Sequence, residues 1–178
     1  MKTRVLLLLL VGVLLISLLA GTLASCGDDA PSDNGGDVTI PGITPDYPAP
    51  PLDSGAQDAN DDEEKLDSLE GGGAVGINYE PTVEIDLSDK KVSLYYKNPK
   101  RSTHDVTIQL VVQDVVLAES GLLTPNKYLT QLSLKDGVSV PEGVYAENAK
   151  IVVRFYDPTT HACSIVNSEL KVTVTVRA

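Results

Sequence analysis

Apolar and polar residues alternate through most of the chain after Gly73. Successive side chains of a strand point to opposite faces, so a period of two predicts strands with one buried face. The runs that show this period lie at 83–87, 92–96, 106–112, 132–134, 149–155 and 170–176. The run from Leu170 to Arg177 alternates without a break and is the clearest strand. No apolar period of 3.6 residues lasts long enough to predict a helix of more than a turn or two.

Turn-forming residues separate these runs at short intervals. Residues such as Asp, Asn, Pro and Gly occupy positions 88–90, 98–99, 113–114, 125–126, 136–137, 141–143 and 157–158. Each of these residue types favours a turn through its own backbone preference or side-chain hydrogen bond. About seven short strands in about 100 residues predict an all-β domain over residues 73–178, a single antiparallel sandwich of two sheets.

The N-terminal segment has a different pattern. Lys2 and Arg4 precede a largely apolar stretch from Val5 to Ala20, and small residues follow it up to Cys26. A positive start, an apolar stretch and a small-residue cleavage site are typical of a secretory signal peptide. The stretch is shorter than the about 20 apolar residues that span a membrane. We therefore predict that residues 1–25 are a signal peptide and that the mature protein begins at Cys26.

The residues at the expected cleavage site are Leu23-Ala24-Ser25-Cys26. A branched apolar residue, two small residues and a cysteine resemble the lipobox of bacterial lipoproteins. The resemblance implies that signal peptidase recognises Leu23, Ala24 and Ser25, and that a diacylglyceryl group on Cys26 anchors the protein in a membrane. Two or three acyl chains on one residue make such attachment effectively stable. The resemblance also implies an extracytoplasmic location, lipid-anchored to the cell membrane.

Two other interpretations of this segment stay open. It could be a transmembrane anchor that is not cleaved, or an ordinary secretory signal cut before an incidental cysteine. The Gly and Ser residues that follow Ala20, in place of positive charge, favour the lipoprotein over the uncleaved anchor.

Acidic and small residues dominate the segment that follows. Between Gly27 and Gly72 there are 13 acidic residues, one lysine and few large apolar residues. Such a composition cannot bury enough apolar surface to offset the entropy lost on ordering. We expect residues 26–72 to be the lipidated cysteine and a disordered acidic linker. Its 13 acidic residues and one lysine give a balance of −12, which accounts for the whole net charge of −11. The Asp61–Glu64 cluster lacks the alternating ligand spacing of a calcium loop.

A short motif near the C-terminus sharpens the fold prediction. Gly143 and Tyr145 lie just before the expected strand that starts at Ala149. Gly-x-Tyr at this place resembles the tyrosine corner of immunoglobulin-like (Ig-like) domains, in which the tyrosine hydroxyl bonds to upstream backbone. The resemblance implies an Ig-like sandwich. The chain has no tryptophan, and acylation of Cys26 would leave Cys163 as the only free cysteine, so a true immunoglobulin domain is not expected.

Several strand-and-turn stretches are also similar to small sandwich modules of Gram-positive surface proteins. They are Leu94–Pro99, Asp105–Leu110, Ser120-Gly121, Gly143–Tyr145 and Phe155–Thr159. Because these stretches are strand-and-turn motifs, the similarity implies a fold and no particular activity.

Candidate catalytic and metal-binding residues are few. The two histidines, His104 and His161, fall in predicted turns or strand edges. A hydrolase built from His104, Ser120 and Asp105 would lack a nucleophile elbow. His161 and Cys163 supply two ligands at most, whereas structural zinc sites use four. We therefore expect no enzyme activity, no metal and no cofactor, and Cys163 to be a half-buried strand residue.

A possible ligand surface lies around the adjacent tyrosines. Tyr95 and Tyr96 should face opposite sides of one strand, one in the core and one exposed. Arg101, with Lys97 and Lys100 nearby, could contact an anionic polymer. The acidic chain argues against nucleic acid, whose binders usually have a strong positive surface.

These observations predict a membrane-anchored lipoprotein that displays a non-catalytic sandwich for adhesion, assembly or ligand binding. Its partner would be an unknown extracellular protein or glycan. The alternative is a module that binds cell-envelope glycans through Tyr95, Tyr96 and Arg101. An enzyme with an unrecognised site is the third possibility.

Overall fold

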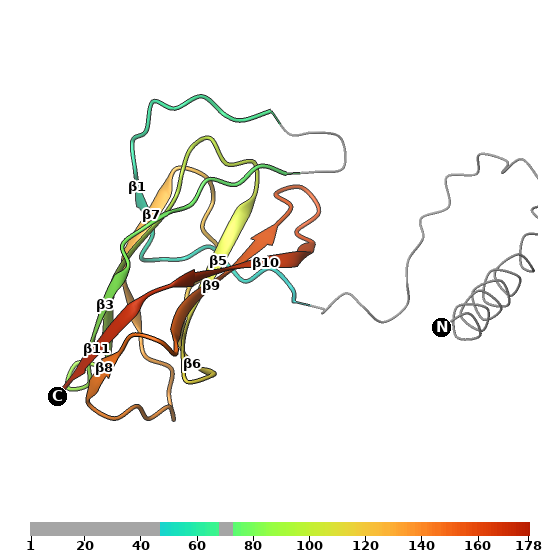
Figure 1. Cartoon of the computed structure of the whole chain (residues 1–178). Coiled ribbons are helices and arrows are strands. Elements are labelled where there is room, and N and C mark those ends of the chain that lie inside the picture. Colours follow the sequence, from blue (N-terminus) through green and yellow to red (C-terminus); the bar gives the residue numbers. More distant parts are fainter. Residues whose placement is uncertain (1–46, 68–72) are drawn as a thin grey trace, which may run out of the picture. The chain divides into compact units, whose positions relative to one another are not determined.

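The structure, a computed structural model, describes residues 47–67 and 73–178 (Figure 1). The signal peptide, the lipobox and Cys26 lie outside the described residues. Within them the chain forms strands and no helix, so the prediction of an all-β fold is confirmed. The strands are β1 (Gln57–Asp58), β2 (Asn78–Tyr79), β3 (Thr82–Asp86), β4 (Lys91–Asn98), β5 (Asp105–Val112), β6 (Val115–Glu119), β7 (Lys127–Ser133), β8 (Gly143–Tyr145), β9 (Ala149–Tyr156), β10 (Cys163–Lys171) and β11 (Thr173–Arg177).

The strands form two sheets. The first sheet has the order β1-β7-β4-β3-β11-β8, and β2 also pairs with β4. The second sheet has the order β10-β9-β5-β6. The strand pairs are antiparallel except β3 with β11, which is parallel. The prediction of two antiparallel sheets is therefore correct for all but this one pair.

The core lies between the two sheets and is built largely by alternate residues of β3, β4, β5, β9 and β11. In β4, Val92, Leu94 and Tyr96 are buried, and the residues between them are exposed or half-buried. Val106 and Ile108 of β5 belong to the same cluster of buried side chains. The alternation seen in the sequence thus marks the face of each sheet that meets the other sheet.

The predicted strand from Leu170 to Arg177 is divided between the two sheets. Leu170 pairs with Ile151 of β9 in the second sheet, whereas Val174 pairs with Val83 in the first sheet. Val172, which is 1% exposed, lies at the crossing between β10 and β11. The side-chain period continues through the crossing, so the sequence pattern does not reveal that the backbone changes its partner strand.

The sequence predicts the first strand and the turn of the hairpin β5–β6, but not its second strand. Its turn at Gln113 and Asp114 was expected, and both residues have positive φ angles, of 50° and 62°. Two consecutive residues with positive φ form the type I′ turn that joins two antiparallel strands. Strand β6 itself was not predicted, because the sequence Val-Val-Leu-Ala-Glu does not alternate.

Residues 47–67, which we call the strap, pack against the sandwich instead of belonging to a disordered linker. In Figure 1 the strap is the teal segment that includes β1. Gln57 pairs with Tyr128 of β7, and Leu52 forms a parallel bridge with Leu122. The linker prediction is therefore wrong for residues 47–67. Composition measures the apolar area that a segment can bury, but this segment is ordered by hydrogen bonds to the backbone of an exposed sheet edge.

At Gly121 the backbones of the strap and the sandwich lie close together. The backbone N–H of Gly121 donates to the carboxylate of Asp53 at 2.7 Å. A Cβ atom on Gly121 would lie 2.7 Å from the Cα of Asp53 and 2.8 Å from the carbonyl oxygen of Pro51. Both neighbours are backbone atoms, so only a glycine lets the strap approach this closely.

We expect Gly121→Ala to lower the free energy of unfolding by about 1–3 kcal/mol, the usual cost of overpacking. The strap must shift, so its amides should exchange faster with solvent, as measured by hydrogen exchange of residues 47–67. Ser54→Ala, an exposed change in the strap, is the control and should leave exchange unchanged. Unaltered protection of the strap in Gly121→Ala would contradict this contact.

Candidate functional site

Of the two adjacent tyrosines, only Tyr95 reaches the surface. Tyr96 is 0% exposed and belongs to the core, and burial raises the pKa of its hydroxyl. Among the described residues, the Tyr96 hydroxyl has no hydrogen-bond partner. The expectation that one tyrosine lies in the core holds, but the assignment of Tyr96 as a ligand contact is wrong, because its side chain faces the other sheet.

Tyr95 lies on the outer face of the first sheet. Its ring centroid is 6.0 Å from that of Tyr128, at an interplanar angle of 35°. The hydroxyl of Tyr128 donates to the side chain of Gln57 in the strap at 2.8 Å. The outer face therefore carries a tyrosine pair, and the strap holds one member of it.

The basic residues of the predicted ligand surface face carboxylates of the strap. The Nζ of Lys97 donates to Asp61 at 2.6 Å, and both side chains are largely buried. Arg101 Nε lies 3.9 Å from a carboxylate oxygen of Glu63. The acidic cluster that was considered as a calcium site thus pairs with cations of the sandwich. No group of three or more metal-ligating side chains occurs in the described part of the chain.

The two histidines lie near a buried carboxylate at the start of β5. Asp105 pairs with Tyr156 across β5 and β9 and is 5% exposed. Within the described ranges its carboxylate makes no hydrogen bond. Burial raises the pKa of Asp105, and the nearby charge of Asp157 adds to this; His161, His104 and Lys65 act in the opposite direction.

The carboxylate of Asp105 lines a cleft between the strap and the second sheet. The cleft has a volume of about 640 Å³ and is open to solvent. Its lining residues are Ala49, Pro50, Pro51, Leu52, Asp105, Leu122, Thr124, Pro158 and His161. Sequence reasoning missed this site, because the prolines were assigned to the linker and Asp105 was considered only as part of a catalytic triad. A carboxylate at the first position of a buried strand was the available signal.

Ser120 and His104 have separate partners, not each other. The hydroxyl of Ser120 accepts a hydrogen bond from the Ile108 N–H at 2.9 Å and donates to the Gly121 carbonyl at 2.8 Å. The Nδ1 of His104 lies 3.0 Å from the hydroxyl of Thr103. Ser120 therefore links β5 to the segment that contacts the strap.

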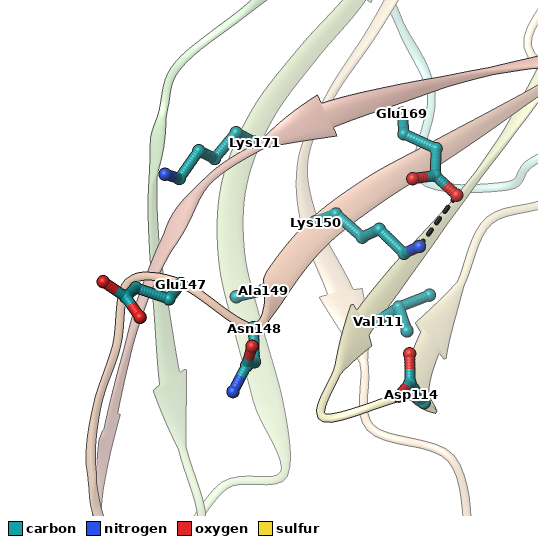
Figure 2. A pocket seen from close by; sticks show the side chains of 8 residues that line it. All are labelled: Val111, Asp114, Glu147, Asn148, Ala149, Lys150, Glu169 and Lys171. Carbon is teal, nitrogen blue, oxygen red and sulfur yellow. Dashed lines mark hydrogen bonds and ion pairs between the residues drawn. The ribbon is translucent and has the colours of Figure 1, made fainter.

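A second cleft, of about 380 Å³, lies where β9 begins and β10 ends (Figure 2). Lys150 and Glu169 face each other across it, with Nζ 2.7 Å from a carboxylate oxygen, and Lys171 points away from this pair. Asp114 and Glu147 are exposed. Because the charges here are solvated or paired, this cleft holds no buried group that lacks a partner.

Three further residues from the sequence analysis have defined positions. The hydroxyl of Tyr145 donates to the carbonyl of Pro141 at 2.8 Å, four residues upstream, as in a tyrosine corner. Gly143, at the start of β8, has a φ angle of 152°. Cys163 is a free, half-buried cysteine at the start of β10, opposite Tyr156.

In comparisons with family models, curated proteins and solved structures, none matched this chain. Over the described residues, no helix is long and apolar enough to cross a membrane.

Buried Tyr96 and half-buried Tyr145 lead to opposite expectations for the same substitution. Tyr96→Phe removes a buried hydroxyl without a partner, so the free energy of unfolding should stay equal or rise by about 1 kcal/mol. Tyr145→Phe removes the bond to Pro141 and should lower it by about 1 kcal/mol. Urea unfolding of both variants checks this. A large loss of stability in Tyr96→Phe would show that its hydroxyl is bonded.

Asp105→Asn should stabilise the protein at neutral pH. A carboxyl group whose folded pKa lies above its unfolded pKa destabilises the fold when it is ionised. The free energy of unfolding should rise by only about 1 kcal/mol, because the new amide still lacks a hydrogen-bond partner. The full increase should be seen at pH values above the folded pKa of Asp105. It should shrink as pH falls through that pKa and vanish below the unfolded value of about 3.8. Thermal unfolding from pH 3 to pH 8 measures it, with Asp114→Asn as an exposed control; equal shifts at all pH values would contradict it.

Proposed function

We propose that this protein is a membrane-anchored extracytoplasmic lipoprotein that displays a non-catalytic sandwich for adhesion, assembly or ligand binding. The observation that carries the proposal is the sequence Leu23-Ala24-Ser25-Cys26 behind an apolar stretch of signal-peptide length. A diacylglyceryl group on Cys26 would hold the mature protein at the membrane surface. An extracellular protein is the first candidate partner, and a glycan the second.

The displayed domain, in this proposal, is an Ig-like sandwich. Strands β3, β4 and β7 are neighbours in one sheet, as strands A, B and E are in immunoglobulin domains. The order β10-β9-β5-β6 in the other sheet corresponds to G-F-C-C′. The bond between Tyr145 and Pro141 supports the same assignment. Such domains commonly present their loops and sheet edges to partners.

The strap changes how far the domain can reach from the membrane. Tyr47 contacts the sandwich, because its ring centroid lies 3.7 Å from the guanidinium carbon of Arg154 in β9. Whereas the linker expected from the sequence had 46 residues, Tyr47 follows Cys26 by only 21. At about 3.5 Å per residue, such a chain spans at most about 70 Å. The sandwich would therefore act close to the membrane, where a partner in the cell envelope is within reach.

A glycan contact would now depend on fewer residues than the sequence suggested. Tyr95 and Tyr128 are half-buried on the outer face of the first sheet, and Arg101 is exposed beside Glu63. Because Lys97 is paired with Asp61 and Tyr96 is in the core, the protein partner is favoured over the glycan.

The anchor is tested by metabolic labelling with an alkyne fatty acid in a bacterium that expresses the full chain. We expect the protein to be labelled and membrane-bound, and Cys26→Ser to be unlabelled. Cys163→Ser is the matched control and should be labelled as the original protein is.

The alternatives give different results in the same experiment. An unlabelled protein that stays in the membrane with its N-terminus intact indicates an uncleaved anchor. An unlabelled protein in the medium or periplasm indicates an ordinary secretory signal. Either result would overturn the proposed lipid anchor.

A further inference from the structure

We propose that the cleft between the strap and the second sheet binds an alkylammonium group, such as a lysine side chain or a primary amine, through the carboxylate of Asp105. This site goes beyond the proposed lipid-anchored display and does not depend on it. The inference rests on one buried acidic group, the walls around it and the position of the strap.

The carboxylate of Asp105 has nearby positive charge from His161, His104 and Lys65 but no direct ion pair or hydrogen bond among the described residues. The residue is 5% exposed. Buried carboxylates are normally paired or hydrogen-bonded, because an isolated charge loses its hydration. Asp105 lines the cleft, so a cation that enters the cleft would give its carboxylate a direct partner.

The walls of the cleft suit a ligand with methylene groups next to its charge. Pro50, Pro51 and Leu52 of the strap form one side, and Leu122 and Pro158 also line the cleft. Small-molecule sites typically combine such apolar walls with a few polar groups that fix the orientation. Here the polar groups are the carboxylate of Asp105, the hydroxyl of Thr124 and the ring of His161.

An organic ammonium ion fits this set of groups better than a metal ion does. Calcium takes about six to eight oxygen ligands, and catalytic or structural zinc takes at least three protein ligands. The described residues contain no cluster of three or more His, Cys, Asp or Glu side chains that could hold a metal. An ammonium group needs only one carboxylate and one or two further acceptors, and the hydroxyl oxygen of Thr124 is one such acceptor among the lining residues.

The site exists only when the strap is docked. Pro51 and Leu52 are held in place by two backbone hydrogen bonds, Leu122 N–H to Pro51 O at 2.9 Å and Asp53 N–H to Leu122 O at 3.0 Å. The residue before Leu122, Gly121, lies close to the backbone of Asp53 and Pro51. A change that moves the strap at Gly121 should therefore weaken binding without touching the carboxylate.

The test uses the purified full chain in detergent and follows binding by NMR titration with defined probes. The probes are Nα-acetyl-lysine methylamide, n-butylammonium and, as a neutral control, Nα-acetyl-norleucine methylamide. We expect an ammonium probe to bind, the norleucine derivative to bind at least tenfold more weakly, and Asp105→Asn to lose at least tenfold in affinity. Asp114→Asn should bind as the original protein does.

Each outcome decides for or against the site. Binding of both ammonium probes supports a site for small amines, and binding of the lysine derivative alone supports a site for a lysine side chain of a partner protein. A weaker affinity in Gly121→Ala supports the strap as a wall. Absence of ammonium binding, equal binding of the norleucine derivative, or full affinity in Asp105→Asn overturns the proposal. None of these results changes the labelling of Cys26, so the two proposals can fail separately.

Discussion

The alternate side chains of the two sheets meet in one core, and the position of each surface feature follows from that contact. Ile108 and Ile151 are fully buried on the inner faces of β5 and β9. In β5, the residues between the core positions, Asp105 among them, must then lie on the outer face. The packing of the core thus places a carboxylate on the outside of the second sheet, where a further layer is needed to bury it.

The strap supplies that layer and joins the two sheets. It bridges to Leu122 beside the second sheet and then pairs through β1 with β7, the edge of the first sheet. Its acidic side chains pair with Lys97 and Lys127 of the sandwich. A segment with the composition of a disordered linker is therefore ordered by a partner surface that provides backbone hydrogen bonds, opposite charge and room at Gly121.

Several positions that the sequence analysis considered for ligand contact or catalysis have structural roles, whereas the sequence did not predict the cleft. Tyr96 fills the core, Ser120 bonds to two backbone groups, and Lys97 pairs with Asp61. The cleft combines Pro51, Asp105 and His161, which are far apart in the chain. A site of this kind depends on which segments meet, and motif spacing carries no information about that.

The sequence by itself determined the all-β class, most of the long strands and the inward face of each, because a side-chain period of two is a local property of the backbone. It also contained the Tyr145 corner, whose hydrogen bond spans four residues. Only the tertiary structure decided that the chain changes sheets at Val172, that residues 47–67 dock on the sandwich, and that Asp105 is buried. These three features depend on contacts between segments that are far apart in the chain. The free energy of such contacts depends on sheet edges and surfaces that form only after folding, and no local sequence pattern describes them.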